Sequence, residues 1–225
     1  MNRIKKTVII SLGGSIIVPD EINILFLKKF KKFVLKFLKQ GYTFVIVTGG
    51  GKICRNYQKA AAQISQLTSE DKDWLGIHST RLNAHLLRTI FKKQAYPTVL
   101  DSPYKEIKKT HHKLFIASGW RPGFSTDYNA VILAQMFKVN KIINASNITH
   151  VYNKKKKNLT KISWRDYRRL ISPKWTPGMN TPFDPIAAKT AQKNGLSVIV
   201  ANGIDLDNLR SIIQEKEFKG TIIHP

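Results

Sequence analysis

Short apolar, β-branched runs alternate with longer amphipathic segments along almost the whole chain, and this alternation restricts the fold most. Such runs, bounded by turn residues, are typical of buried strands. The predicted strands are Val8–Leu12, Phe44–Val47, Pro97–Leu100, Leu114–Ala117, Lys141–Asn144 and Ser197–Val200. Because helical segments separate the strands, the sequence predicts βαβ units, a mainly parallel sheet and therefore the α/β fold class.

The segments between the strands carry apolar residues at helical spacing. The predicted helices are Ile22–Lys39, Arg55–Leu67, Ile77–Lys92, Asp127–Phe137, Ser163–Ile171, Pro185–Asn194 and Leu206–Glu215. The strands are apolar on both sides, so we expect helices on both faces of the sheet, which gives a three-layer α/β/α sandwich. The length fits one domain covering residues 1–225.

Three of the predicted strands run directly into glycine-bearing turns. These turns are Gly13-Gly14-Ser15, Gly49-Gly50-Gly51-Lys52 and the segment from Gly119 to Asp127. Glycine lets backbone N–H groups come close to an anion, and a following helix adds its positive end. Ligands bind at the carboxyl ends of strands in open α/β sheets, so the turns predict a site for several phosphates. The spacings match neither a P-loop nor a dinucleotide fingerprint.

Composition excludes several classes of protein. Cys54 is the single cysteine, which rules out a disulfide or a cysteine-based zinc site within one chain. No apolar run approaches the roughly 20 residues of a membrane span, and the N-terminus lacks a signal-peptide pattern. We therefore expect a cytoplasmic protein without a membrane partner.

The formal net charge is +24, from 38 Lys and Arg against 14 Asp and Glu. Such an excess can reflect non-specific nucleic-acid affinity or a biased composition with a generally anion-friendly surface. The cations are scattered along the chain, and the single low-complexity patch is Asn153–Asn158, which contains four successive lysines. Both interpretations stay open.

Six motifs in order resemble those of the amino-acid kinase superfamily, and within it the uridylate (UMP) kinases of the short archaeal type. The matching segments are Leu12–Ser15, Gly49–Arg55, Asp73–Ile77 with Thr80–Ala84, Pro122–Asp127, Asn144–Ile148 with Val151-Tyr152, and Asp184–Lys189. The resemblance runs from about Val8 to Ile223. It implies an amino-acid kinase fold and Mg²⁺-dependent transfer of the ATP γ-phosphoryl group to UMP in pyrimidine nucleotide synthesis.

The resemblance also implies a role for each matching residue. An N-terminal lobe of about residues 1–130 would bind the acceptor, and a C-terminal lobe of about 131–225 would bind ATP. The implied UMP-binding residues are Gly50, Asp73, Gly119, Trp120, Arg121, Pro122, Gly123, Phe124, Ser125 and Thr126. The implied ATP-binding residues are Ser11, Gly13, Gly14, Ser15, Gly51, Arg55, Ser146, Tyr152 and Lys155. The implied catalytic residues are Lys52, Arg55, Asp127, Asp184 and Lys189. A homo-oligomer, either a dimer or a hexamer, is the implied assembly.

Structural roles compete with these functional ones. Asp73 and Asp127 are placed where they could cap the helices that follow, and Asp184 before Pro185 is an ordinary helix opening. Tyr152 could be a packed loop aromatic, and Lys189 could be solvated. The phenylalanines of Ile22–Lys39 suit either the core or a dimer face; they are Phe26, Phe30, Phe33 and Phe37.

The chain departs from the resembled pattern at Ser11 and around Tyr152, where Thr149-His150 replaces Asp-Gly and Lys155 replaces an acid. Ser11 stands where many relatives carry a lysine, so compensating charge is expected from Lys52, Arg55 or Lys189. Lys155 stands where relatives carry an acid near the donor nucleotide, which predicts altered ATP binding. Two other functions therefore stay open: a superfamily kinase with a different small-molecule acceptor, and a nucleotide- or RNA-binding relative that has lost catalysis.

Overall fold

The central feature is a seven-stranded sheet in the computed structural model, which describes residues 6–176, 178–179 and 181–225. In spatial order its strands are β3 (Leu114–Ala117), β2 (Thr43–Thr48), β1 (Thr7–Leu12), β4 (Lys141–Ser146), β8 (Ser197–Asn202), β9 (Thr221–His224) and β7 (Lys161–Ser163). Neighbouring strands are parallel except β8 and β9. The predicted mainly parallel α/β sheet is confirmed.

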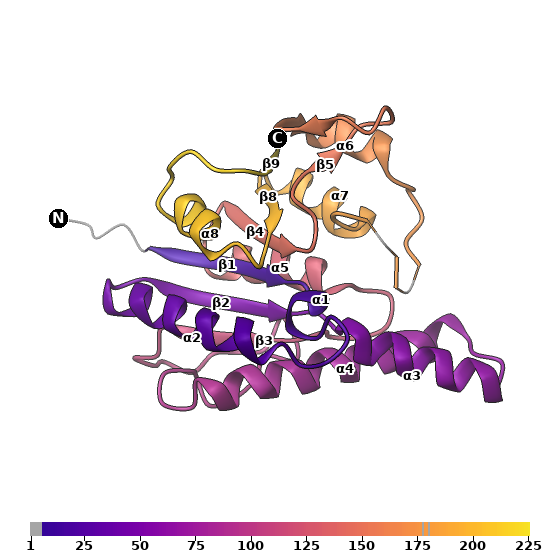
Figure 1. Ribbon diagram of the computed structural model, residues 1–225, viewed down its shortest axis with the longest axis horizontal. Helices are drawn as coiled ribbons and strands as arrows, with labels where there is room; N and C mark the ends of the chain where they lie inside the picture. Colours follow the sequence, from indigo (N-terminus) through magenta and orange to yellow (C-terminus); the bar gives the residue numbers. More distant parts are fainter. Residues whose placement is uncertain (1–5, 177, 180) are drawn as a thin grey trace.

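Side chains alternate across the sheet and build a core on each face. Ile10 and Ile46 face the layer formed by α2 (Ile24–Lys39), α4 (Ser69–Ile90) and α8 (Leu206–Ile213). Ile9 and Val45 face the opposite layer. That layer contains α5 (Thr126–Met136), α6 (Trp164–Leu170) and α7 (Pro185–Lys193). The three-layer α/β/α sandwich is therefore confirmed (Figure 1).

Helix α2 contributes an aromatic row to the core. Phe26, Phe30, Phe33 and Phe37 are each at most 6% exposed, and successive rings lie 5.0–6.2 Å apart between centroids. The helix begins at the N-cap Asn23, whose side chain accepts from the Phe26 N–H. These phenylalanines pack inside the protein, so the core interpretation is correct for them rather than an exposed dimer face.

Two further helices stand at the carboxyl end of the sheet. The short α1 (Gly14–Ile17) follows β1, and α3 (Gly51–Ile64) follows β2 and packs along α4 (Figure 1). No described residue of α3 is buried. A small hairpin, β5 (Val151–Tyr152) with β6 (Asn158–Leu159), completes the fold.

The structure corrects several predicted elements. Pro97–Leu100 is not a strand: Ala95 and Leu100 form isolated bridges with β3, and Pro97 has no N–H for a ladder. Helix α4 begins at Ser69 rather than at residue 77, because Thr68 and Asp71 form a capping box.

Among the described residues, no helix is both long and apolar enough to cross a membrane.

Candidate active site

The first two glycine turns pack backbone to backbone at the carboxyl ends of β1 and β2. A Cβ added at Gly14 would lie 2.0 Å from the Gly51 nitrogen, so no larger residue fits there. Asn83 of α4 is 1% exposed, and its amide donates to the carbonyls of Gly49 (2.8 Å) and Gly50 (3.2 Å). Because the Gly49 and Gly50 carbonyls accept from α4, the N–H groups of this turn stay available for an anionic ligand.

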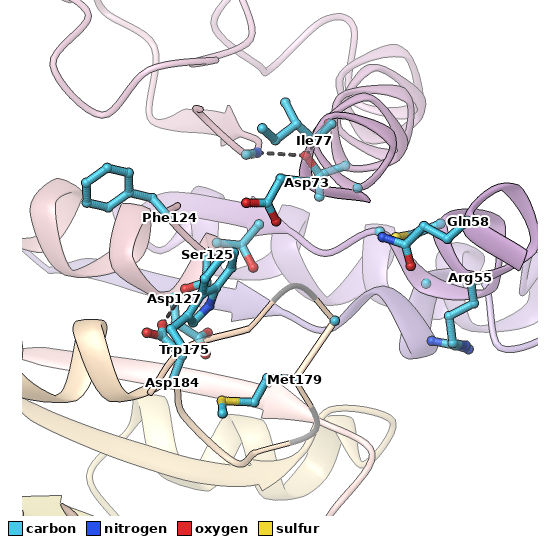
Figure 2. Close-up of a pocket in the computed structure, with 18 of the residues that line it drawn as sticks. Arg55, Gln58, Asp73, Ile77, Phe124, Ser125, Asp127, Trp175, Met179 and Asp184 are labelled. Atoms are coloured by element: carbon cyan, nitrogen blue, oxygen red, sulfur yellow. Dashed lines mark hydrogen bonds between the residues drawn. The ribbon is translucent and has the colours of Figure 1, made fainter. Parts of the chain in front are cut away.

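A cavity of about 290 Å³ opens beside these turns. Its walls come from α3, α4, the third glycine turn and the segment before α7 (Figure 2). The lining residues are Gly50, Gly51, Cys54, Arg55, Gln58, Asp73, Gly76, Ile77, Thr80, Gly119, Phe124, Ser125, Thr126, Asp127, Trp175, Gly178, Met179, Thr181 and Asp184. A site of this kind combines backbone donors, carboxylates and one guanidinium.

Asp73 links helix α4 to the third turn. Its Oδ2 accepts a hydrogen bond from the Gly123 N–H at 2.8 Å, and its carboxylate points into the cavity (Figure 2). Partial burial raises the pKa of Asp73, while the Gly123 hydrogen bond opposes that rise. Asp73 does not cap the helix, because Thr68 is the N-cap. Its free carboxylate lone pairs can accept from ligand hydroxyls.

Two carboxyl groups, Asp127 and Asp184, meet at the base of the cavity (Figure 2). Asp184 is 4% exposed and caps α7 by accepting from the N–H groups of Ile186 and Ala187, and the Ser125 hydroxyl also donates to it. The helix-opening role of Asp184 is thus confirmed. It does not exclude a second role, because the side chain also lines the cavity.

Asp127 is not the N-cap of α5. Ser125 is, with its hydroxyl accepting from the Tyr128 N–H, and Asp127 lies in the first turn. Burial and the neighbouring Asp184 charge raise the pKa of Asp127 to about 7, against the lowering effect of a hydrogen bond from Ser11. Burial also raises the pKa of Asp184. The pair therefore holds a proton more readily than isolated carboxyl groups do.

The candidate cations are distributed unequally. Among the described lining residues, Arg55 is the one cation, and Figure 2 shows it on α3. The Lys52 ammonium lies 3.4 Å from Asp20 and does not line the cavity. Lys189 is exposed on α7 and does not line it either.

The third turn is held by a hydrogen bond to Thr80 and by stacking of Arg121 on two aromatic rings. The Gly119 N–H donates to Thr80 Oγ1 at 2.7 Å. The Arg121 guanidinium stacks 4.1 Å from the Trp120 ring and 5.1 Å from the Phe124 ring. Residues 120–123 do not line the cavity, whereas Phe124, Ser125 and Thr126 do. These contacts fix the turn, and the turn carries the lining residues.

The residues implied for the donor lie outside this cavity, apart from Gly51 and Arg55. Ser146 ends β4, and its hydroxyl accepts from the Ile148 N–H at 3.3 Å. Tyr152 is 45% exposed on β5, so the packed-aromatic interpretation is wrong for it. Lys155 is exposed in the hairpin turn. Ser11, Gly13, Gly14 and Ser15 follow or end β1 beside the cavity, without lining it.

Sequence reasoning missed several lining residues. Cys54 and Gln58 share one face of α3 with Gly51 and Arg55, so helical spacing could have identified them. Trp175 and Met179 come from an irregular segment before α7, and no local pattern marks them.

The mainly parallel sheet, the paired glycine turns and the carboxylate-lined cavity define an α/β fold with a site suited to phosphate groups. The Amino acid kinase family model matches residues 6–202, and the chain belongs to that family. It is similar to uridylate kinase from Pyrococcus abyssi, with 29% identity over 97% of this chain and 99% of the relative. It is also similar to uridylate kinase from Methanocorpusculum labreanum, with 32% identity over 96% of this chain and 94% of the relative.

Structural comparison agrees with the sequence comparison. The crystal structure of uridylate kinase from Archaeoglobus fulgidus matches with a TM-score of 0.79 and 28% identity, over 96% of this chain and 99% of that one. UMP kinase from Bacillus anthracis has the same fold, with a TM-score of 0.74 at 22% identity, over 99% and 97%. The resemblance stated from the motifs is confirmed.

Proposed function

We propose that this protein is a UMP kinase, which transfers the γ-phosphoryl group of ATP to the 5′-phosphate of UMP. The observation that carries the proposal is Asp73, a carboxylate that faces a cavity between two glycine turns, which Arg55 also lines. Near-full-length similarity to several uridylate kinases supports the choice of acceptor.

The acceptor nucleotide has suitable partners in the cavity. Asp73 accepts hydrogen bonds from the ribose hydroxyls of UMP, since a carboxylate is an acceptor only. Gly50 and the 119–126 turn supply backbone N–H groups for its phosphate and base. Within that turn, Trp120, Arg121 and Pro122 do not line the cavity and contribute by holding the turn in place. Arg55 offers a guanidinium to the phosphates, which suits bidentate recognition.

The donor side follows from the remaining glycines. Gly13, Gly14, Ser15 and Gly51 hold the ATP phosphates, and Ser146, Tyr152 and Lys155 lie on the base side. The proposed lobes are residues 1–130 for UMP and 131–225 for ATP. Lys52 and Lys189 can take part only if their side chains move, since neither lines the cavity as it stands.

The residues present fit Mg²⁺ brought in with ATP. Asp127 and Asp184 are adjacent hard oxygen ligands, and Mg²⁺ in kinases is held by one or two carboxylates plus substrate phosphates. Among the described residues, no group of three or more His, Cys, Asp or Glu is arranged to hold a metal ion. When bound, Mg²⁺ neutralises charge on the phosphate oxygens.

The chain's own contribution is positioning and electrostatics. Ser11 and Ser125 each donate to one carboxylate and so fix its orientation. Backbone N–H groups of the turns and the Arg55 guanidinium are preorganised donors toward phosphate oxygens, where charge accumulates during transfer. No covalent intermediate on the protein is required.

A coupled ADP-release assay with ATP and Mg²⁺ tests the proposal with UMP, CMP, dUMP, AMP and N-acetylglutamate as separate acceptors. Turnover with UMP well above the others is expected. Asp73→Asn weakens charge-assisted hydrogen bonds worth about 1.5–3 kcal/mol, so the KM for UMP rises roughly 10- to 150-fold. Asp71→Asn is the matched control in the same helix, because Asp71 serves the capping box and does not line the cavity.

Other outcomes select the alternatives. Preference for the carboxylate acceptor N-acetylglutamate, or for carbamate or isopentenyl phosphate added to the same assay, assigns another kinase of the family. Folded protein without turnover on any acceptor assigns a nucleotide- or RNA-binding relative. Ser11 and Lys155, which depart from the family pattern, would then be signs of lost catalysis. We also infer a cytoplasmic homo-oligomer, a dimer or a hexamer, which light scattering on the purified protein measures.

A further inference from the structure

A strongly basic segment runs from the β5–β6 hairpin turn through α6. Between residues 154 and 174 it carries nine cations and one acid, Asp166, whereas the whole chain has 38 Lys and Arg against 14 acids. All nine are exposed: Lys154, Lys155, Lys156, Lys157, Lys161, Arg165, Arg168, Arg169 and Lys174. Figure 1 shows the β5–β6 hairpin and α6 on the side of the molecule remote from α2 and α4.

Neutralisation within the segment is slight. Asp166 lies 3.5 Å from both Arg165 and Arg169, and Arg168 donates to the neutral Gln192. In the described part of the chain, no carboxylate forms a salt bridge with the lysines 154–157. The turn thus presents four successive ammonium groups to solvent.

The turn is held in a fixed shape. Asn153 Oδ1 accepts from the N–H groups of Lys155 and Lys157, each at 2.9 Å, and the Lys156 N–H donates to the Asn153 carbonyl. At the base of the hairpin the buried Thr221 hydroxyl accepts from the Val151 N–H and donates to the Leu159 carbonyl. The four lysines of the turn are therefore carried by a hydrogen-bonded hairpin.

A lysine occupies one turn position where the backbone conformation disfavours it. Lys156 has φ +58°, the left-handed conformation that glycine or asparagine adopts more easily. Neighbouring like charges add repulsion. Lys138 and Glu215 have the same conformation, so the backbone angle of Lys156 does not by itself mark a binding site.

We propose that the hairpin turn and the exposed face of α6 bind single-stranded RNA. The lysines and arginines contact phosphates, and Tyr152, 45% exposed at the entrance to the turn, offers a ring for base stacking. An exposed aromatic beside clustered cations favours a nucleic acid over an acidic protein, which would not use the stacking surface. This binding activity goes beyond the proposed kinase reaction, although Tyr152 and Lys155 also lie on the proposed ATP base side.

Fluorescence anisotropy with labelled oligocytidylate over a series of salt concentrations tests the proposal. The variant carries Lys154→Gln, Lys155→Gln, Lys156→Gln and Lys157→Gln. The control removes the same charge from exposed lysines of α2: Lys28→Gln, Lys29→Gln, Lys32→Gln and Lys36→Gln. Each phosphate contact to a single strand contributes about 0.7 to the slope of log K against log salt, so the turn variant lowers the slope by about 2.8.

The control variant should keep the wild-type slope. Equal loss in both variants, or no loss in either, overturns the proposal, because binding would then follow net charge alone. Tyr152→Ala should weaken binding roughly 5- to 150-fold at constant salt slope. Lys156→Gly, which relieves the backbone strain, guards against misfolding of the multiple variant: it should lower the slope by about 0.7. An unchanged slope in folded Lys156→Gly also contradicts the proposal.

Discussion

The Ser11 hydroxyl donates a hydrogen bond to Asp127 Oδ1 at 2.9 Å, joining residues that are 116 positions apart. Ser11 lies near the end of β1, and Asp127 lies in the first turn of α5. Ser11 occupies the position where the family resemblance led us to expect a lysine. A hydroxyl there adds no charge, but it stabilises the ionised form of a buried carboxyl group.

The first prediction concerns Ser11→Ala. Removing a hydrogen bond to the charged form raises the pKa of Asp127 above about 7, on the order of one unit. If the ionised pair supports transfer, the acidic limb of the kcat profile moves to higher pH by a similar amount. Rates measured across the neutral pH range check this. Ser11→Thr, which keeps the hydroxyl, should restore the wild-type limb; an unmoved limb in Ser11→Ala would contradict the assignment.

The second prediction concerns stability without nucleotide. The pKa of Asp127 rises from 3.8 to about 7 on folding, so between these values the folded protein holds a proton that the unfolded chain has lost. The free energy of unfolding therefore falls as pH rises through this range, by a few kcal/mol at most. Urea unfolding at several pH values measures the slope.

Asp127→Asn should flatten that pH dependence. Asp71→Asn is the matched comparison, because the pKa of Asp71 is lowered and its contribution lies at more acidic pH. A slope in Asp127→Asn equal to that of the wild type would show that Asp127 ionises normally in the folded protein.

The third prediction concerns the contact between glycine turns. Gly14→Ala places a methyl group 2.0 Å from the Gly51 nitrogen, which the backbone cannot absorb locally. We expect a loss of at least about 3 kcal/mol, or no folded protein. Gly41→Ala is the control: Gly41 has φ +88° and open space around it, so only the conformational cost of about 1–2 kcal/mol applies. Similar unfolding free energies for the two variants would argue against the packed turns.

The fourth prediction concerns Arg121. Its stack on Trp120 and Phe124 holds the turn that bonds Asp73 through Gly123. Arg121→Met loses roughly 0.5–1 kcal/mol of cation–π attraction, so the KM for UMP rises about two- to fivefold while kcat stays near wild type. Arg210→Met, on α8, is the background variant: Arg210 is half-buried, forms an ion pair with Asp207 and does not line the cavity. A fall in kcat with unchanged KM would instead place Arg121 in the chemistry.

The fold was predictable where local patterns and tertiary packing agree. The predicted strands in the middle of the sheet all form, because fully apolar β-branched runs have few other ways to be buried. The elements that were missed are short or at an edge: β7, β9 and the β5–β6 hairpin depend on partners distant in sequence. The strand predicted at Pro97–Leu100 does not form, because an apolar run alone does not provide the successive backbone N–H donors of a β-ladder.

The site was predictable where backbone chemistry dictates the residue. Glycines at strand ends could be predicted, because close backbone approach leaves a mark in the sequence, whereas Asp73 was expected from the family resemblance alone. Trp175 could not, since an aromatic in an irregular segment reaches the cavity only through the folded chain. The unequal status of Lys52, Lys189 and Arg55 likewise depends on geometry that no spacing rule contains.

Strand β1 pairs with β2 on one side and with β4 on the other, so the boundary between the proposed lobes runs through a single continuous ladder. During synthesis, β1 and β2 emerge long before Lys141–Ser146, and until then β1 exposes an unpaired apolar edge. A nascent chain stalled near residue 130 would therefore be open to strand exchange. For the same reason, fragments cut at that point should recombine, since each supplies the edge that the other lacks.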